Sequence, residues 1–189
     1  MKKVVGLLIL FIVVLSACKE VPTPKPRGYF RIDYPEKTYQ VFDSTCPFTF
    51  EYPQYGVIES VEAGYFEPCW FNISFPGHKA KIHLTYKALQ NNLGPHLEDV
   101  RTLVNKHIVK ADDIIEHIII GREAEVYGII YELKGNTASS ATFFVTDSVN
   151  HFLSGSLYFS SLPNKDSLAP SINFFQEDIV HLTKTLTWK

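Results

Sequence analysis

The sequence lacks the short motifs that mark the commonest enzyme active sites. It contains no G-x-S-x-G, no H-E-x-x-H, no phosphate-binding glycine loop and no dinucleotide fingerprint, so it predicts none of the corresponding nucleophile, zinc or nucleotide sites. The acidic pairs Glu98-Asp99 and Asp112-Asp113 do not replace them, because adjacent side chains diverge on a helix. We attribute the first pair to a helix dipole and the second to a turn. We therefore predict a protein that is not an enzyme and has no catalytic residues.

Metal-ligand spacing is also lacking. Seven histidines are present, but no two of them are paired at metal-ligand spacing. His83 is expected on the polar face of a strand, His107 and His181 on helices, and His117 in a run of uncertain structure. Hydrogen-bonded or solvent-facing histidines explain these positions. The sequence thus predicts no metal and no cofactor.

Runs of basic residues are absent as well. The chain carries 18 Lys and Arg against 20 Asp and Glu. A mildly acidic chain without basic clusters is not expected to bind nucleic acid, or to bind anionic lipid by charge. Hydrophobic residues make up 46% of the chain and aromatic residues 14%, a composition that excludes a disordered tether.

There is a single long apolar run, and it lies at the N-terminus. Lys2 and Lys3 precede the stretch from Val4 to Ala17, which at 14 residues is short of the about 20 needed to span a membrane. The run ends in Leu-Ser-Ala-Cys, which has the form of a bacterial lipobox rather than of a plain secretory cleavage site. We therefore interpret residues 1–17 as a lipoprotein signal peptide and Cys18 as the acylated first mature residue, carrying palmitate among its acyl chains. The alternative is an ordinary cleaved signal, or an uncleaved anchor, with a chance cysteine.

Cysteine is scarce, with three in the chain. With Cys18 assigned to lipid, Cys46 and Cys69 remain as an even pair in an exported protein, which predicts a disulfide. It would close a loop of 24 residues and stabilise the fold by about 3–4 kcal/mol. The alternative is two buried free thiols.

Three parts are expected along the chain: the signal peptide 1–17, a lipidated N-terminus with a proline-rich stalk over 18–27, and a single globular domain over 28–189. Prolines at alternate positions from 22 to 26 favour an extended polyproline conformation. Residues 28–42 are rich in Tyr and Phe and are expected to pack on the domain, an exposed recognition strip being the alternative.

Alternating apolar and polar residues predict strands over 48–52, 57–62, 69–75, 79–86, 124–134, 139–147 and 151–160. The strands at 69–75 and 79–86 are expected to form a hairpin around Pro76-Gly77. Residues 113–120 are ambiguous, and their β-branched side chains favour a strand. Helical periodicity predicts helices over 95–110 and 170–187, with Pro95 and Pro170 in their first turns and Trp188 closing the second. The fold class is α+β, a largely antiparallel sheet covered by two main helices.

Several segments carry a resemblance to a known family. They are Arg27–Lys37, Cys46–Pro53, Pro68–Ile73, Lys81–Lys87, Val126–Asn136 and His151–Phe159. On these segments the chain resembles the gliding-motility lipoprotein GldD family of Bacteroidetes over essentially its whole mature length. The resemblance implies a part of the cell-envelope machinery for gliding, which is linked to type IX secretion. It transfers no catalytic residue, only the lipidated cysteine at Cys18.

The expected function is that of a membrane-anchored envelope lipoprotein that supports assembly or stability of this machinery. Its expected partners are the membrane, through the N-terminal lipid, and other gliding and secretion envelope proteins. The two residues after Cys18 lack a longer acidic run, which favours a periplasm-facing position. The fold also looks loosely like PsbP/Mog1-type domains, which act as assembly factors. The alternative function is a periplasmic ligand-binding or hydrolytic lipoprotein acting on cell-wall or nutrient fragments, which predicts a deep pocket with converging polar groups.

Overall fold

The computed structural model describes residues 31–61, 67–122 and 125–189. The chain divides into two units, Met1–Asp33 and Tyr34–Lys189. In the first unit, the described residues include an exposed pair in which the Arg31 Nε donates to the Asp33 carboxylate at 2.9 Å. The signal peptide, Cys18 and the stalk lie outside the described residues. The second unit holds all the helices and strands described below.

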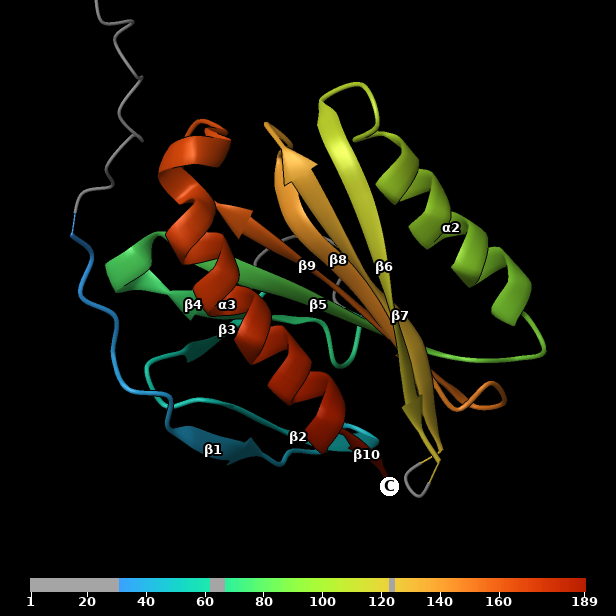
Figure 1. Cartoon of the computed structure of the whole chain (residues 1–189). Coiled ribbons are helices and arrows are strands. Elements are labelled where there is room, and N and C mark those ends of the chain that lie inside the picture. Colours follow the sequence, from blue (N-terminus) through green and yellow to red (C-terminus); the bar gives the residue numbers. More distant parts are fainter. Residues whose placement is uncertain (1–30, 62–66, 123–124) are drawn as a thin grey trace, which may run out of the picture. The chain divides into compact units, whose positions relative to one another are not determined.

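A seven-stranded antiparallel sheet forms the centre of the second unit (Figure 1). Its strand order is β3-β4-β5-β9-β8-β7-β6, so every pair is a sequence neighbour except β5 with β9. The strands are β3 (Val57–Ser60), β4 (Phe71–Phe75), β5 (Ala80–Ala88), β6 (Ala111–Gly121), β7 (Val126–Gly135), β8 (Ser139–Thr146) and β9 (His151–Phe159). This arrangement confirms the α+β class and the largely antiparallel sheet. It places β3 and β6 at the two edges.

A second, three-stranded sheet joins the two ends of this unit. β2 (Phe48–Pro53) lies between β1 (Tyr39–Phe42) and β10 (Thr187–Trp188) and pairs with both in antiparallel fashion. Phe48 and Phe50 of β2 are fully buried, whereas Thr49 and Glu51 are not, as the alternation in the sequence predicts. The strands at either end of Tyr34–Lys189 are thus fixed to one central strand.

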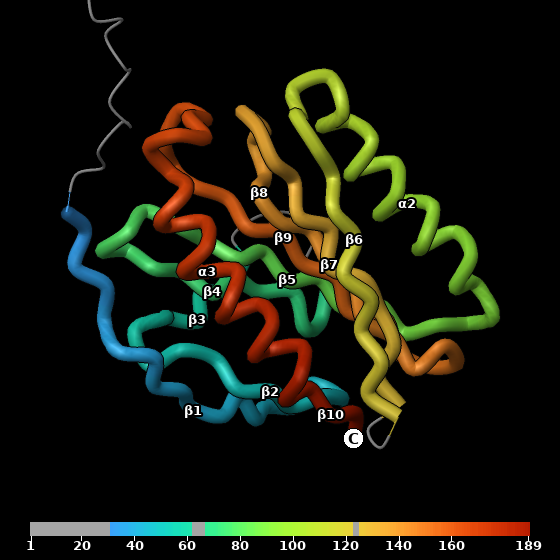
Figure 2. Tube along the Cα trace, viewed as in Figure 1, coloured from blue at the N-terminus to red at the C-terminus, as the bar shows by residue number. Residues whose placement is uncertain are grey.

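Two helices, α2 (Leu93–Asn105) and α3 (Lys165–Thr185), pack on opposite faces of the large sheet (Figure 2). On β8, Phe143 belongs to the core beneath α3, and its neighbour Phe144 belongs to the core beneath α2. Successive residues of a strand point to opposite faces, so the helices cover different sides. The α3 core also includes the buried aromatic residues of β2 and β4. A short 3-10 helix, η1 (Pro76–His78), connects β4 to β5.

The structure has a strand within each predicted range, residues 62 and 124 of those ranges lying outside the described residues. It confirms the hairpin of β4 and β5 around Pro76-Gly77. It also confirms the strand interpretation of the ambiguous run, which forms β6. All five residues of β4 are buried, including the polar Asn72 and Ser74. Of the aromatic segment 28–42, Tyr34 packs on the domain as expected, since its ring stacks on Phe174 with centroids 4.4 Å apart.

The structure confirms the first predicted helix and the place of Pro95 in its first turn, but not the predicted ends of the helix. α2 begins at Leu93, so Glu98 lies beyond its first turn, and it ends at Asn105 rather than at 110. The chain then turns, with the amide of His107 donating to the Val104 carbonyl at 3.0 Å. Consequently His107 lies just after the helix, and Ile108 is exposed instead of buried. The apolar periodicity of the sequence continues beyond Asn105 because the apolar residues of strand β6 follow directly after the turn.

The second helix begins earlier than predicted. α3 begins at Lys165, where the Asn164 side chain accepts a hydrogen bond from the Ser167 amide at 3.1 Å and caps the helix. Pro170 therefore lies inside the helix. The helix ends at Thr185, and Trp188 belongs to β10. There its ring stacks on His151 with centroids 5.1 Å apart.

Candidate functional site

An apolar groove runs between the β6–β7 hairpin and helix α3, with a volume of about 870 Å³. Its apolar lining consists of Ile118, Ile119, Ile120, Val126, Ile130, Val180 and Leu186. Its polar lining includes His117, Glu132, Gln176, Glu177 and Lys184. Groups of both charges therefore surround an apolar centre. Grooves of this size and composition are typical of binding sites.

The strand register shows which lining residues turn their side chains toward α3, whereas Ile118 and Ile120 point to the opposite face of β6. Ile130 lies opposite His117, and Val126 lies opposite Gly121, so the four residues share the face of the sheet that α3 covers. Val126 and Ile130 belong to the same core as α3. The groove exists because α3 crosses this face and leaves the last two strands uncovered beside it.

Gln176 supplies a polar group within this apolar lining. Its amide nitrogen Nε2 is buried and has no hydrogen-bond partner among the described residues. A buried donor without an acceptor costs about 1–3 kcal/mol.

A second polar cluster lies on another side of α3, around the buried carboxylate of Asp178. One oxygen, Oδ1, accepts from the Lys37 ammonium at 2.7 Å and from the Tyr39 hydroxyl at 3.1 Å. The other, Oδ2, accepts from the Tyr55 hydroxyl at 2.6 Å. The Lys37 ammonium also donates to the Phe174 carbonyl at 2.6 Å. We call Lys37, Tyr39, Tyr55 and Asp178 the Asp178 cluster.

The two phenols of the Asp178 cluster are held in their neutral form. Burial, reinforced by Asp178, raises the pKa of Tyr39 to about 12. Burial and the hydrogen bond to Asp178 raise the pKa of Tyr55 further above its ordinary range. Neutral phenols act as donors to the carboxylate rather than as bases or nucleophiles. Each of the two carboxylate oxygens is satisfied, so the cluster fastens residues 37–55 to α3.

The predicted histidine positions all have local explanations. His181 lies on α3 as predicted; its Nε2 is 2.7 Å from the Glu51 carboxylate, and its ring stacks on Tyr39. His117 lies on β6, with Nε2 3.1 Å from the Glu132 carboxylate. His83 is on the polar face of β5 beside Asn72, and burial lowers its pKa. Among the described residues, no group of three or more metal-ligand side chains comes together.

The acidic pairs do not converge on a common point. Glu98 lies 3.7 Å from Arg101 on the same helix. Asp112 pairs with the Lys165 ammonium, while the Asp113 carboxylate accepts from the Ile114 amide at 2.9 Å. Each of these acidic side chains thus has a basic or backbone partner of its own, and no two of these carboxylates face each other.

Cys46 and Cys69 are joined by a disulfide, with their Cα atoms 5.7 Å apart. Cys46 lies two residues before the start of β2, and Cys69 lies two residues before the start of β4. The bond therefore ties the three-stranded sheet to the seven-stranded sheet. Cys18 lies outside the described residues, and its lipidation stays a prediction. In the described parts of the chain, no helix has the length and apolarity needed to cross a membrane.

Sequence reasoning missed both the groove and the Asp178 cluster. The groove depends on where α3 crosses the sheet, which no local pattern reports. Asp178 did leave a signal, because it lies beside Ile179 on the stripe that also contains Phe175 and faces the core. An acidic residue at such a position requires a cationic or hydroxyl partner.

The described residues thus define an α+β domain that carries an apolar groove, and no set of reactive groups converges among them. A family model described as gliding motility lipoprotein GldD matches residues 19–188. The chain belongs to this family of lipoproteins tied to gliding motility, which is consistent with attachment to a membrane of the cell envelope. The family description names no reaction. A comparison with curated proteins found no match.

Proposed function

We propose that this chain is a lipid-anchored envelope protein that supports assembly or stability of the gliding machinery and its associated type IX secretion system. In this proposal it holds an apolar segment of another envelope protein in the groove between β6–β7 and α3. The observation that carries it is the groove itself, an apolar lining of about 870 Å³ beside strand β6 at the sheet edge. Membership of a motility family supports the choice of partner class.

The composition of the groove fits a peptide segment. An amphipathic helix or an extended strand binds by placing apolar side chains in such a groove while its polar groups meet the rim. Here Ile119, Ile130 and Val180 offer the apolar contacts. Glu177 and Lys184 on α3 would orient the segment by charge.

Attachment through Cys18 belongs to the same proposal. Several acyl chains on one cysteine anchor a protein durably, whereas a single chain binds only marginally. The anchor would keep the domain at the membrane where the machinery is built, facing the periplasm. The loose likeness to PsbP/Mog1-type assembly factors points the same way.

A test is to replace Val180, which lines the groove and is 36% exposed, with lysine in the full-length lipoprotein. The gene is deleted in its native host and complemented with this variant. We expect a loss of colony spreading and type IX export approaching that of the deletion, at unchanged protein level. The matched control is Leu162→Lys, a position 89% exposed and outside the groove lining.

Full activity of Val180→Lys would contradict the role of the groove. A Cys18→Ala copy tests the anchor separately, and we expect it to rescue poorly. Full rescue by this copy would contradict the anchoring half of the proposal and leave the groove half standing.

A second candidate function is that of a periplasmic ligand-binding or hydrolytic lipoprotein acting on cell-wall or nutrient fragments. The volume of the groove favours it. It predicts that a lipid or fragment co-purifies with the native protein and is lost from Val180→Lys. A native mass spectrum free of any such ligand would count against it.

A further inference from the structure

Strand β6 forms one end of the seven-stranded sheet, so its outer edge pairs with no strand among the described residues. At 11 residues, it is long for an edge strand. Soluble proteins protect such edges with charges, bulges or prolines. The first half of β6 has these features, a register shift between Ala111 and Asp113 and the charges of Asp112, Asp113 and Glu116. The stretch Ile118–Gly121 has none of them.

This unprotected stretch is also strongly exposed. Ile118 is 75% and Ile120 is 62% exposed. Both lie on the same face of the strand, where Ile120 is opposite the partly exposed Tyr127 of β7. An exposed apolar edge of this kind favours pairing with a further strand.

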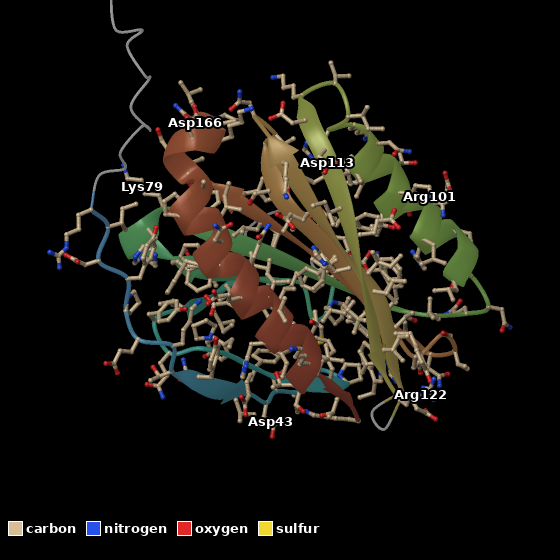
Figure 3. The ribbon with its side chains drawn as sticks, viewed as in Figure 1. Asp43, Lys79, Arg101, Asp113, Arg122 and Asp166 are labelled. Atoms are coloured by element: carbon tan, nitrogen blue, oxygen red, sulfur yellow. A yellow bond between two sulfur atoms is a disulfide. The ribbon has the colours of Figure 1, made fainter. Side chains whose placement is uncertain are left out.

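The charged residues on either side of this stretch indicate which strand would pair with it. Glu116 and Arg122 each lie three residues from Ile119, on opposite sides, and both are exposed. Neither forms an ion pair with any described residue. Figure 3 shows Arg122 at the hairpin end of β6 and Asp113 near the other end. An antiparallel strand with the same sequence, centred on Ile119, would place each glutamate opposite an arginine.

We propose that β6 is a homodimer interface, pairing antiparallel with β6 of a second copy about a twofold axis at Ile119. In this register Ile119 lies opposite the partner's Ile119, and Ile118 lies opposite the partner's Ile120. Glu116 lies opposite the partner's Arg122, and the reciprocal pair forms on the other side of the axis. Facing residues of two antiparallel strands share one face of the sheet, so a twofold axis perpendicular to the sheet pairs odd-numbered with odd-numbered and even-numbered with even-numbered residues. All these pairs meet that condition.

The pairing joins two sheets into one and brings the two grooves to either side of the axis. Strand pairing over one edge buries less than the about 800 Å² per partner of an ordinary stable interface. Two copies held in the same membrane meet at a raised effective concentration, which makes a modest edge contact sufficient. The strength of dimerisation in the membrane therefore depends on the proposed lipid anchor. The pairing register depends only on the sequence of β6.

The register is tested by disulfide trapping in native membranes with the full-length lipoprotein. Ile119→Cys places two thiols at facing positions with Cα atoms about 4.5–5.5 Å apart, within disulfide range. The matched control, Ile115→Cys, lies on the same face of the same strand, but its two copies would be about 26 Å apart. After oxidation with diamide, we expect a species of twice the monomer mass for Ile119→Cys and none for Ile115→Cys.

Charge reversal then distinguishes a second copy from a different partner. In the Ile119→Cys background, Glu116→Arg and Arg122→Glu alone should each lower the trapped fraction several-fold. The double variant restores the opposite charges and should return the yield to that of Ile119→Cys. Equal trapping at positions 115 and 119, no trapping at 119, or a double variant as weak as the single variants would each overturn the proposal. These outcomes leave the spreading result for Val180→Lys unchanged, so the two proposals fail separately.

Discussion

At the scale of single residues, Asp178 determines how the N-terminal part of the domain is held. Its side chain is fully buried and lies 2.7 Å from the Lys37 ammonium. The same ammonium lies 3.4 Å from the centroid of the Phe174 ring, so one cation meets a carboxylate, a carbonyl and an aromatic face. Buried charges are tolerated only when they are paired in this way. Asp178 therefore makes residues 37–55 part of the domain.

Replacing Asp178 with alanine should lower the free energy of unfolding by about 3–5 kcal/mol, because it leaves the Lys37 ammonium and two phenols without their acceptor. Urea unfolding of the mature chain followed by tryptophan fluorescence measures the change. The control is Glu177→Ala on the neighbouring residue. Its carboxylate is 71% exposed and lies 3.9 Å from the same ammonium, so we expect a change below about 0.5 kcal/mol. Equal effects of the two variants would contradict the burial argument.

At the scale of helices and strands, local patterns predicted most of the elements but not their ends or partners. The alternation of Ile82 and Leu84 with Lys81 and His83 defines β5 because one face of the sheet is buried and the other is polar. Helix ends depend on capping contacts instead. The Asn164 cap begins α3 five residues before Pro170, and a proline at a first-turn position is only one of several start signals.

The partners of the strands were beyond the reach of local patterns. β5 pairs with β9, about 70 residues away in the chain, and β10 pairs with β2 near the other end of the domain. Such contacts follow from which faces fit together in three dimensions. For the same reason the groove was not predicted, although each residue of its lining was visible as part of an apolar run.

The disulfide joins elements rather than residues of one element, and its removal tests how strongly the two sheets depend on each other. Cys46→Ala/Cys69→Ala should lower the free energy of unfolding by about 3–4 kcal/mol on the chain-entropy model. Urea unfolding at neutral pH measures it, with the parent chain under reducing conditions as the control. A peptide map of the native protein tests the bond itself. Recovery of both cysteines as free thiols, or a loss below about 1 kcal/mol, would contradict the prediction.

At the scale of the whole molecule, both ends of Tyr34–Lys189 are fixed to strand β2. β1 pairs with one edge of β2, and β10 pairs with the other. Residues before β1 are further held to α3, where the Tyr34 hydroxyl lies 2.8 Å from the Ser171 hydroxyl. The fold thus has a defined order of contacts from its first residue inward: Tyr34 and Lys37 against α3, then β1 against β2, then the core.

This order has a mechanical consequence. Tension applied through the chain before Tyr34 reaches α3 at the Asp178 cluster before it loads the hydrogen bonds of β1. The Asp178 cluster and the Tyr34 stack then resist the force first, and α3 transmits it to the core through Phe175 and Ile179. In a pulling experiment between the two ends of the mature chain, we expect a first extension of about 30 Å as residues 34–42 detach. Asp178→Ala should lower the force of that step and Glu177→Ala should not. A single unfolding event without this step would show that the Asp178 cluster and the Tyr34 stack do not resist the force separately.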